Sequence, residues 1–156
     1  MSKQLKTTLK FQQVQDIKVQ PGQAGKGHTV KILIGGRVTP TEQVEYLWNE
    51  YELGVREPLH WHVTEMAYYI VSGNAILRDI KGKTHQLGPE TLVYAPAGIA
   101  GSHSFEAKTK LEVLELNVYA DIDGPNLPWI LVDEKTKMST IELKNLLKFG
   151  KASPRQ

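Results

Sequence analysis

The chain has 156 residues, long enough for one domain with a substantial core, and its 40% hydrophobic and 23% charged residues exclude the disordered, collagen-like and membrane-spanning classes. It contains no cysteine, which excludes disulfides, thiolate metal sites, iron–sulfur clusters and cysteine nucleophiles. The net charge is +2, with most of the basic excess in residues 1–40, but these charges are scattered and only Phe11 interleaves with them, so we expect no nucleic-acid partner.

Short runs rich in Val, Ile, Leu, Tyr and Thr recur along the chain, and Gly, Pro or Asn separates them. Such runs with turn residues between them predict short strands. In chain order, the expected strands cover residues 14–19, 30–35, 43–53, 58–63, 66–71, 74–80, 84–87, 91–95, 102–106 and 111–119. Many short strands joined by regular turns predict an all-β sandwich or barrel.

The last part of the chain has a different pattern. Residues 121–129 carry two prolines and predict a loop. Residues 139–149 predict a short helix, since Ser139 and Glu142 form a capping-box pattern and Gly150 is a stop signal. We expect a single domain over residues 1–156, with an N-terminal arm and strands (1–43), a barrel (44–119) and a C-terminal loop and helix (120–156).

The residues that carry chemistry lie between Gly54 and His103. His60 and His62 are separated by Trp61 on an expected strand, which places both imidazoles on one face. Their Cα atoms are then about 6.6 Å apart, so both rings can reach one metal ion at about 2.1 Å. An isolated pair of this kind is more often a surface or core feature, and two histidines hold a divalent ion loosely. A third ligand is needed, and His103 is the candidate.

These residues resemble the two motifs of the cupin superfamily, over about residues 44–119. The first motif, G-x5-H-x-H-x3,4-E-x6-G, is matched at both outer glycines and both histidines: Gly54, His60, His62 and Gly73. The second, G-x5-P-x-G-x2-H-x3-N, resembles the segment with Pro96, Gly98 and His103. The His-Trp-His-x-x-Glu-x-Ala-Tyr run is similar to oxalate-decarboxylase-type cupins. The resemblance implies a double-stranded β-helix, a jelly roll whose motif strands line a central metal pocket.

The sequence departs from both motifs. Glu65 follows His62 after two residues instead of three or four, and the total length puts Met66 in the family's glutamate position. A strict strand register points Glu65 away from the histidines, whereas a turn before the next strand would bring it back. In the second motif Glu90 replaces the opening glycine, the spacing before His103 is longer by two residues, and no Asn follows.

The resemblance therefore implies one of two centres for a single divalent ion. Three histidines with open positions suit Fe, Mn, Zn or Ni, and Glu65 as a fourth ligand would give the commoner three-His, one-Glu cupin centre. If it is not a ligand, Glu65 is the candidate catalytic base. By strand parity, the residues expected to line the pocket are Tyr46, Trp48 and Met66. Two further histidines are expected outside the site, His28 in a loop and His85 on the surface.

The implied function is a metal-dependent enzyme acting on a small organic molecule, with dioxygenase- or decarboxylase-like chemistry first. One alternative is a non-redox isomerase, cyclase or lyase. Another is a non-catalytic metal- or ligand-binding cupin, which the altered motifs favour, because a fold does not imply an activity. We expect a homodimer and no membrane partner. The sequence shows no signal-peptide pattern, so a cytoplasmic location is expected.

Overall fold

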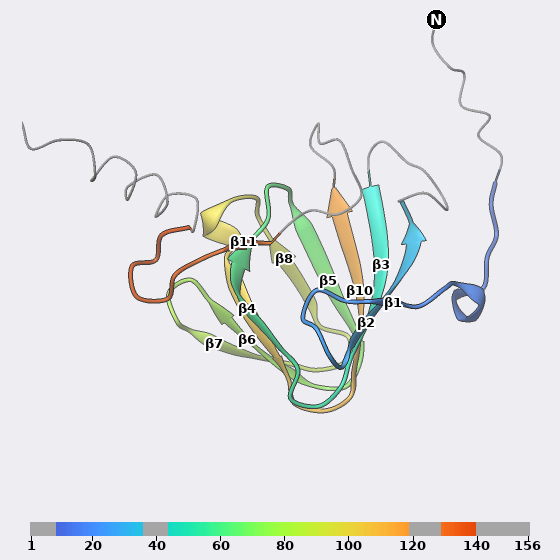
Figure 1. The fold of residues 1–156 in the computed structure, drawn as a ribbon, viewed down its shortest axis with the longest axis horizontal. Coiled ribbons are helices and arrows are strands. Elements are labelled where there is room, and N and C mark those ends of the chain that lie inside the picture. Colours follow the sequence, from blue (N-terminus) through green and yellow to red (C-terminus); the bar gives the residue numbers. More distant parts are fainter. Residues whose placement is uncertain (1–8, 36–43, 119–128, 140–156) are drawn as a thin grey trace, which may run out of the picture.

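The computed structural model describes residues 9–35, 44–118 and 129–139, and within them the chain is nearly all β (Figure 1). The strands are β1 (Gln20–Pro21), β2 (His28–Ile34), β3 (Val44–Tyr51), β4 (Arg56–Trp61), β5 (Met66–Ser72), β6 (Ala75–Asp79), β7 (Thr84–Leu87), β8 (Leu92–Ala95), β9 (His103–Ala107), β10 (Leu111–Val118) and β11 (Ile130–Leu131). Two 3₁₀ turns, η1 (Val14–Asp16) and η2 (Ile99–Gly101), complete the described elements. Among these residues no helix has the length and apolar character needed to cross a membrane.

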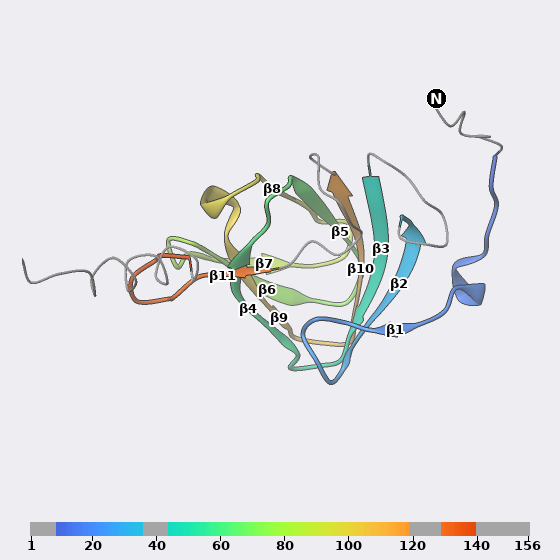
Figure 2. The same cartoon turned by 45° about the horizontal axis from the view of Figure 1, so that its top comes forward.

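The strands form two antiparallel sheets that face each other, as Figure 2 shows. One sheet has the order β1-β2-β3-β10-β5-β8 and the other β11-β4-β9-β6-β7. This arrangement is the jelly roll expected from the sequence. The short helix expected over residues 139–149 lies outside the described residues apart from its first position, and the division of the chain into an arm, a barrel and a C-terminal part stays a prediction.

The inward face of the larger sheet changes from apolar to polar along its strands. On β10, Leu111 and Val113 are buried in the hydrophobic core, and Glu115 and Asn117 are buried further along the same face. The core cluster consists of Tyr51, Val55, Ile70, Ala75, Leu77, Leu87, Phe105, Ala107, Leu111 and Val113. Apolar burial therefore stabilises one end of the barrel, and buried polar side chains lie toward the other end.

One motif glycine is required by packing. Gly73, between β5 and β6, has a φ of +83°, and a Cβ on it would stand 2.1 Å from the carbonyl oxygen of Lys110. No side chain fits there, and the backbone conformation also favours glycine. The glycine that closes the first motif thus holds the β5–β6 turn against the start of β10.

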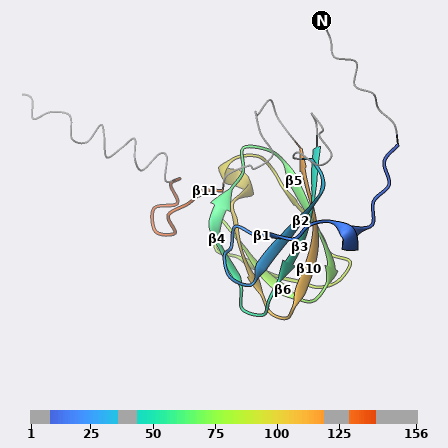
Figure 3. The ribbon, with the colours of Figure 1, turned by 45° about the vertical axis from the view of Figure 1, so that its right-hand side comes forward.

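The prediction of a strand over residues 14–19 is wrong. Residues 14–16 form η1, where the Asp16 N–H donates to the Gln13 carbonyl oxygen at 3.0 Å, and Figures 1 and 3 show this segment beside the barrel. The segment has no buried residue and pairs with no strand, so its alternation has nothing to bury against. The sequence analysis also missed β1 and β11, which are two residues long and show no periodicity.

Candidate metal centre

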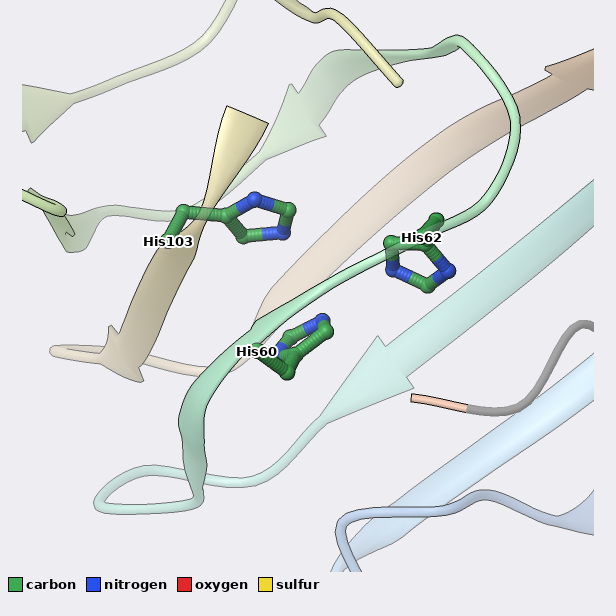
Figure 4. A group of neighbouring side chains, drawn as sticks. All are labelled: His60, His62 and His103. Carbon is green, nitrogen blue, oxygen red and sulfur yellow. The ribbon is translucent and has the colours of Figure 1, made fainter. Parts of the chain in front are cut away.

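The three predicted histidines meet in the barrel. His60 lies near the end of β4, His62 follows that strand, and His103 begins β9, where it pairs directly with His60. One ring nitrogen from each lies within 4.8 Å of the others, and Figure 4 shows the three side chains gathered around a common space. All three are buried, with exposed fractions of 0%, 5% and 3%. The antiparallel pairing of β4 with β9 is what brings together residues 43 positions apart.

Backbone carbonyls orient two of the rings. Nδ1 of His60 lies 2.7 Å from the Pro58 carbonyl oxygen, and Nδ1 of His103 lies 2.8 Å from that of Gly101. A carbonyl only accepts, so each Nδ1 carries the hydrogen and each Nε2 is the unprotonated nitrogen with a lone pair. This is the arrangement by which proteins fix the tautomer of a metal-binding histidine.

The donor set fits a divalent metal ion. Nε2 of His60 and both ring nitrogens of His62 are buried and have no hydrogen-bond partner among the described residues. Leaving a buried polar atom unpaired costs about 1–3 kcal/mol, and an ion bound by the three imidazoles would remove that cost. Three nitrogen ligands with open positions suit zinc, iron, manganese or nickel.

Burial keeps the imidazoles neutral, as ligands must be. Loss of solvation, reinforced by the neighbouring His103, lowers the pKa of His60 to about 2 and that of His62 to about 4. Burial also lowers the pKa of His103, against the opposing bond to Gly101. Protons therefore compete weakly with a metal ion at this site near neutral pH.

Tyr68 also reaches the centre, from β5. Its hydroxyl lies 2.8 Å from Nε2 of His103, and because that nitrogen is the unprotonated one, the hydroxyl donates. A metal ion on this Nε2 would take over the lone pair and free the Tyr68 hydroxyl for another partner. Tyr68 was not among the residues predicted for the site.

The structure does not bring Glu65 to the histidines. Its side chain is exposed, and its Oε1 accepts a hydrogen bond from the Tyr94 hydroxyl at 2.9 Å. The next residue, Met66, is the first of β5 and is buried at 2% exposure. Since neighbouring strand residues point to opposite faces, the inward Met66 leaves Glu65 outside. The roles of Glu65 as a ligand or base stay predictions.

A cavity of about 390 Å³ adjoins the centre, with His62 and Tyr68 in its wall. From β3 it is lined by Glu45, Leu47, Asn49 and Tyr51. The expected lining residues Tyr46, Trp48 and Met66 are not among those that line it. On β3 the inferred strand parity is thus off by one residue, because the polar side chains Glu45 and Asn49 face inward, where they bond to side chains of β2 and β10.

A hydrogen-bonded network of polar side chains spans this wall. His28 Nδ1 accepts from the Ala24 N–H at 3.1 Å, so its Nε2 is the donor to Asn49 Oδ1 at 3.0 Å. Nδ2 of Asn49 and Nδ2 of Asn117 then donate to the two oxygens of Glu115, at 2.8 and 2.9 Å. His28 was expected in a loop, but it begins β2, is buried and lines the cavity.

Glu57 stands in the same cavity as a neutral acid. Its Oε1 accepts from the Tyr51 hydroxyl at 2.8 Å. Burial raises the pKa of Glu57 to about 8, the Tyr51 bond opposes the rise, and the nearby Glu115 adds to it. Burial likewise raises the pKa of Glu115, against the bonds from Asn117 and Asn49. The cavity therefore holds a carboxyl group that is protonated at neutral pH.

Trp129 is a further residue that the sequence analysis missed. Its ring stacks on His60, with centroids 4.4 Å apart and planes 23° apart, and it lines the cavity. It sits at the end of the expected loop, where no pattern indicates a contact with β4.

The inward polar residues of β10 had a visible signal in the sequence, since Glu115 and Asn117 share the parity of the apolar Leu111 and Val113 on that strand.

Taken with the jelly roll, the buried histidine triad defines a small barrel with a candidate metal centre. A family model described as "Cupin domain" matches residues 48–119. Residues 48–119 thus match the cupin superfamily, as the motifs indicated. No curated protein matches the chain in sequence.

Three solved structures illustrate the likeness of fold. The polyketide cyclase RemF from Streptomyces resistomycificus is 20% identical with a TM-score of 0.66, over 81% of this chain and 89% of that one. An RmlC-like cupin from Shewanella frigidimarina is 14% identical with a TM-score of 0.60, over 73% and 94%. A cupin sugar phosphate isomerase from Silicibacter pomeroyi is 19% identical with a TM-score of 0.59, over 75% and 90%. At these identities the likeness concerns the fold alone.

Proposed function

We propose that this chain is a divalent-metal-dependent enzyme that acts on a small organic molecule in the barrel cavity. The observation that supports this most directly is the buried triad of His60, His62 and His103, with ring nitrogens that lack partners among the described residues. A divalent ion held there would supply a Lewis acid that polarises a substrate oxygen. The side chains of the cavity would transfer protons, orient the substrate and exclude water.

The cavity residues have separable tasks in this proposal. Glu57, protonated at neutral pH, is placed to give a proton to a bound substrate and to take one back. The Tyr68 hydroxyl, freed from His103, orients a substrate oxygen. Trp129 and the apolar residues of β2 and β3 keep bulk water from the reacting group.

Two reaction types are open to such a site. The sequence favoured a dioxygenase- or decarboxylase-like enzyme, and a three-histidine centre is compatible with that chemistry if the ion is redox-active. The protonatable Glu57 beside the centre favours instead the non-redox isomerase, cyclase or lyase, because such reactions consist of proton transfers. We therefore place the non-redox type first. Two of the similar folds bear names of this kind, a polyketide cyclase and a sugar phosphate isomerase.

The metal content of the purified chain tests this proposal. We expect close to one divalent ion per chain in the wild type and loss of the ion in His60→Ala. His85→Ala is the matched control, because His85 lies outside the triad and pairs with Asp79 at 3.2 Å. Oxygen uptake by an iron- or manganese-loaded sample would favour the dioxygenase type. Absence of metal from all samples, even after divalent ions are added back, would reject the enzyme and leave the non-catalytic binding cupin.

The assembly and the location of the protein stay proposals. We propose a homodimer in the cytoplasm, as the sequence led us to expect. Sedimentation equilibrium of the full chain tests the first of these, and fractionation of cells that express it tests the second.

A further inference from the structure

We infer that the molecule bound in this cavity is uncharged and carries several hydroxyl groups, which it presents to one polar wall made of Glu45, Asn49, Glu57, Glu115 and Asn117. The inference rests on the proposed function only in taking the cavity as the substrate site. It excludes carboxylates, phosphates and amines as ligands of the cavity. The substrate class is then narrower than the small organic molecule of the proposed function.

The polar wall has no group to receive an anion. Three glutamates line the cavity, and no lysine or arginine stands among its lining residues in the described ranges. The histidines in the lining are His28 and His62, and burial lowers the pKa of both, so they stay neutral. Arg56 and Arg78 lie elsewhere, in exposed pairs with Glu106 and Glu134. An anion against this wall would be buried without a countercharge, which is strongly unfavourable.

A divalent ion at the histidines does not change this conclusion. Three neutral imidazoles leave the charge of the ion uncompensated, and the buried carboxyl groups of the wall are the acidic groups that share the cavity with it. The charge of the ion favours the ionised form of these carboxyl groups, which then supply the opposite charge within the protein. No anionic substrate is needed for that purpose.

The wall does not suit a cation either. A buried cation requires an ionised carboxylate, and without a metal ion Glu57 is neutral at pH 7 because burial holds its pKa at about 8. With an ion at the histidines, the charge of that ion repels a second cation. The two oxygens of Glu115 already accept hydrogens from Asn49 and Asn117. Oε2 of Glu45 accepts from Asn117 at 3.4 Å. These acids act as hydrogen-bonding groups within a network.

One atom of the wall lacks a donor. Oδ1 of Asn117 is buried and has no hydrogen-bond partner among the described residues, and the side chain, 2% exposed, lines the cavity. Its amide nitrogen donates to Glu115 and Glu45, so the carbonyl oxygen is fixed in place as an acceptor. A hydroxyl group of the ligand is the neutral donor that satisfies it.

Apolar side chains complete the lining of the cavity. Val30, Ile32 and Leu47 come from β2 and β3, beside the polar residues of the same sheet, and the ring of Trp129 comes from the segment before β11. A flat, apolar body packs against these side chains, while its hydroxyl edge faces the polar wall. About 390 Å³ is at the small end of ligand pockets, which suits a molecule of one or two rings. A polyhydroxylated aromatic compound combines these properties.

A matched set of three probes tests the charge preference. Phloroglucinol, 3,5-dihydroxybenzoate and 3,5-dihydroxybenzylamine share a ring with two hydroxyl groups and differ in the third substituent. Each is titrated at pH 6.5 into the full chain, zinc-loaded and zinc-free, and binding is followed by the indole N–H signal of Trp129, assigned with Trp129→Phe. The indole signals of Trp48 and Trp61, which do not line the cavity, are internal controls.

We expect phloroglucinol to shift the Trp129 signal and to bind at least about tenfold more tightly than either charged probe, with and without zinc. Asn117→Leu should lose at least about tenfold of this affinity. Glu50→Gln, an acid-to-amide change on β3 outside the cavity lining, should leave it unchanged. The wild-type preference is measured without any variant, so a folding defect in Asn117→Leu does not obscure it.

Equal or tighter binding of the carboxylate or the amine, or failure of phloroglucinol to bind, overturns the inference. The outcome is distinct from that of the metal test. A chain that holds no metal but prefers phloroglucinol rejects the proposed function and keeps the inference. A chain that holds one metal ion but prefers the carboxylate keeps the proposed function and rejects the inference.

Discussion

Replacing Glu57 by glutamine tests whether the folded barrel holds a neutral carboxyl group. Glu57 is 6% exposed and accepts a hydrogen bond from the Tyr51 hydroxyl at 2.8 Å. Burial raises its pKa from 4.5 to about 8. Glutamine keeps a carbonyl oxygen for the Tyr51 hydroxyl and has no proton that titrates, so Glu57→Gln removes the ionisation and preserves the shape.

The sign of the effect follows from where the proton is bound. Between pH 4.5 and about 8 the folded state holds a proton on Glu57 that the unfolded state has released, so this group's contribution to stability falls as the pH rises. The contribution is complete below pH 4.5 and is lost above about pH 8. A shift of this size corresponds to an upper limit of roughly 5 kcal/mol. We expect Glu57→Gln to gain on the wild type by several kcal/mol across this window.

Urea unfolding of both proteins after removal of metal with a chelator, from pH 5 to 8.5, measures the difference. The buried histidines make both proteins less stable in acid, and subtracting one curve from the other cancels that shared effect. Glu50→Gln on the outer face of β3 is the control and should track the wild type. If the free energies of unfolding of Glu57→Gln and wild type differ by the same amount at every pH, within about 1 kcal/mol, Glu57 is ionised in the fold and the reasoning fails.

Three further outcomes are expected. Zinc at about 100 times its Kd should stabilise the wild type by about 2.7 kcal/mol, seen as a higher Tm that is absent in His60→Ala. Glu65→Ala should retain the metal by elemental analysis, because Glu65 is exposed and bonds Tyr94; loss of metal would restore it as a ligand. Gly22→Ala should lower stability in urea by about 1–3 kcal/mol, because its Cβ would stand 2.3 Å from the His28 ring; unchanged stability would contradict that contact.

The sequence predicted the histidine triad because two of its members are local neighbours on one strand and a motif marks the third. Strand spacing places His60 and His62 on one side, and the second motif indicated a third histidine, which β4–β9 pairing supplies. The contacts of Tyr68 with His103 and of Trp129 with His60 depend on how distant segments pack. No periodicity or motif encodes such contacts, so these two residues could not be predicted.

The pocket wall was misjudged for a physical reason. Sequence analysis assumes that the more apolar face of a strand points inward, which selects Tyr46 and Trp48 on β3. The end of the barrel that contains the cavity holds a polar network, so Glu45 and Asn49 point inward instead. A buried polar face is stable only when its groups bond one another, and the partners are contributed by β2 and β10, which a single strand's pattern does not reveal.

Charge links the histidine triad to this polar wall. In the common cupin pattern a glutamate would sit beside the metal, and here its position is occupied by the buried Met66. The barrel still contains acidic groups near the histidines, because Glu57 and Glu115 line the cavity that His62 also lines. A divalent ion at the histidines would attract the carboxylate form of Glu57 and lower its pKa from about 8 toward neutrality. A carboxyl group in the cavity wall can exchange a proton with a bound molecule, which a carboxylate bound to the ion cannot do, and this is the role proposed above for Glu57.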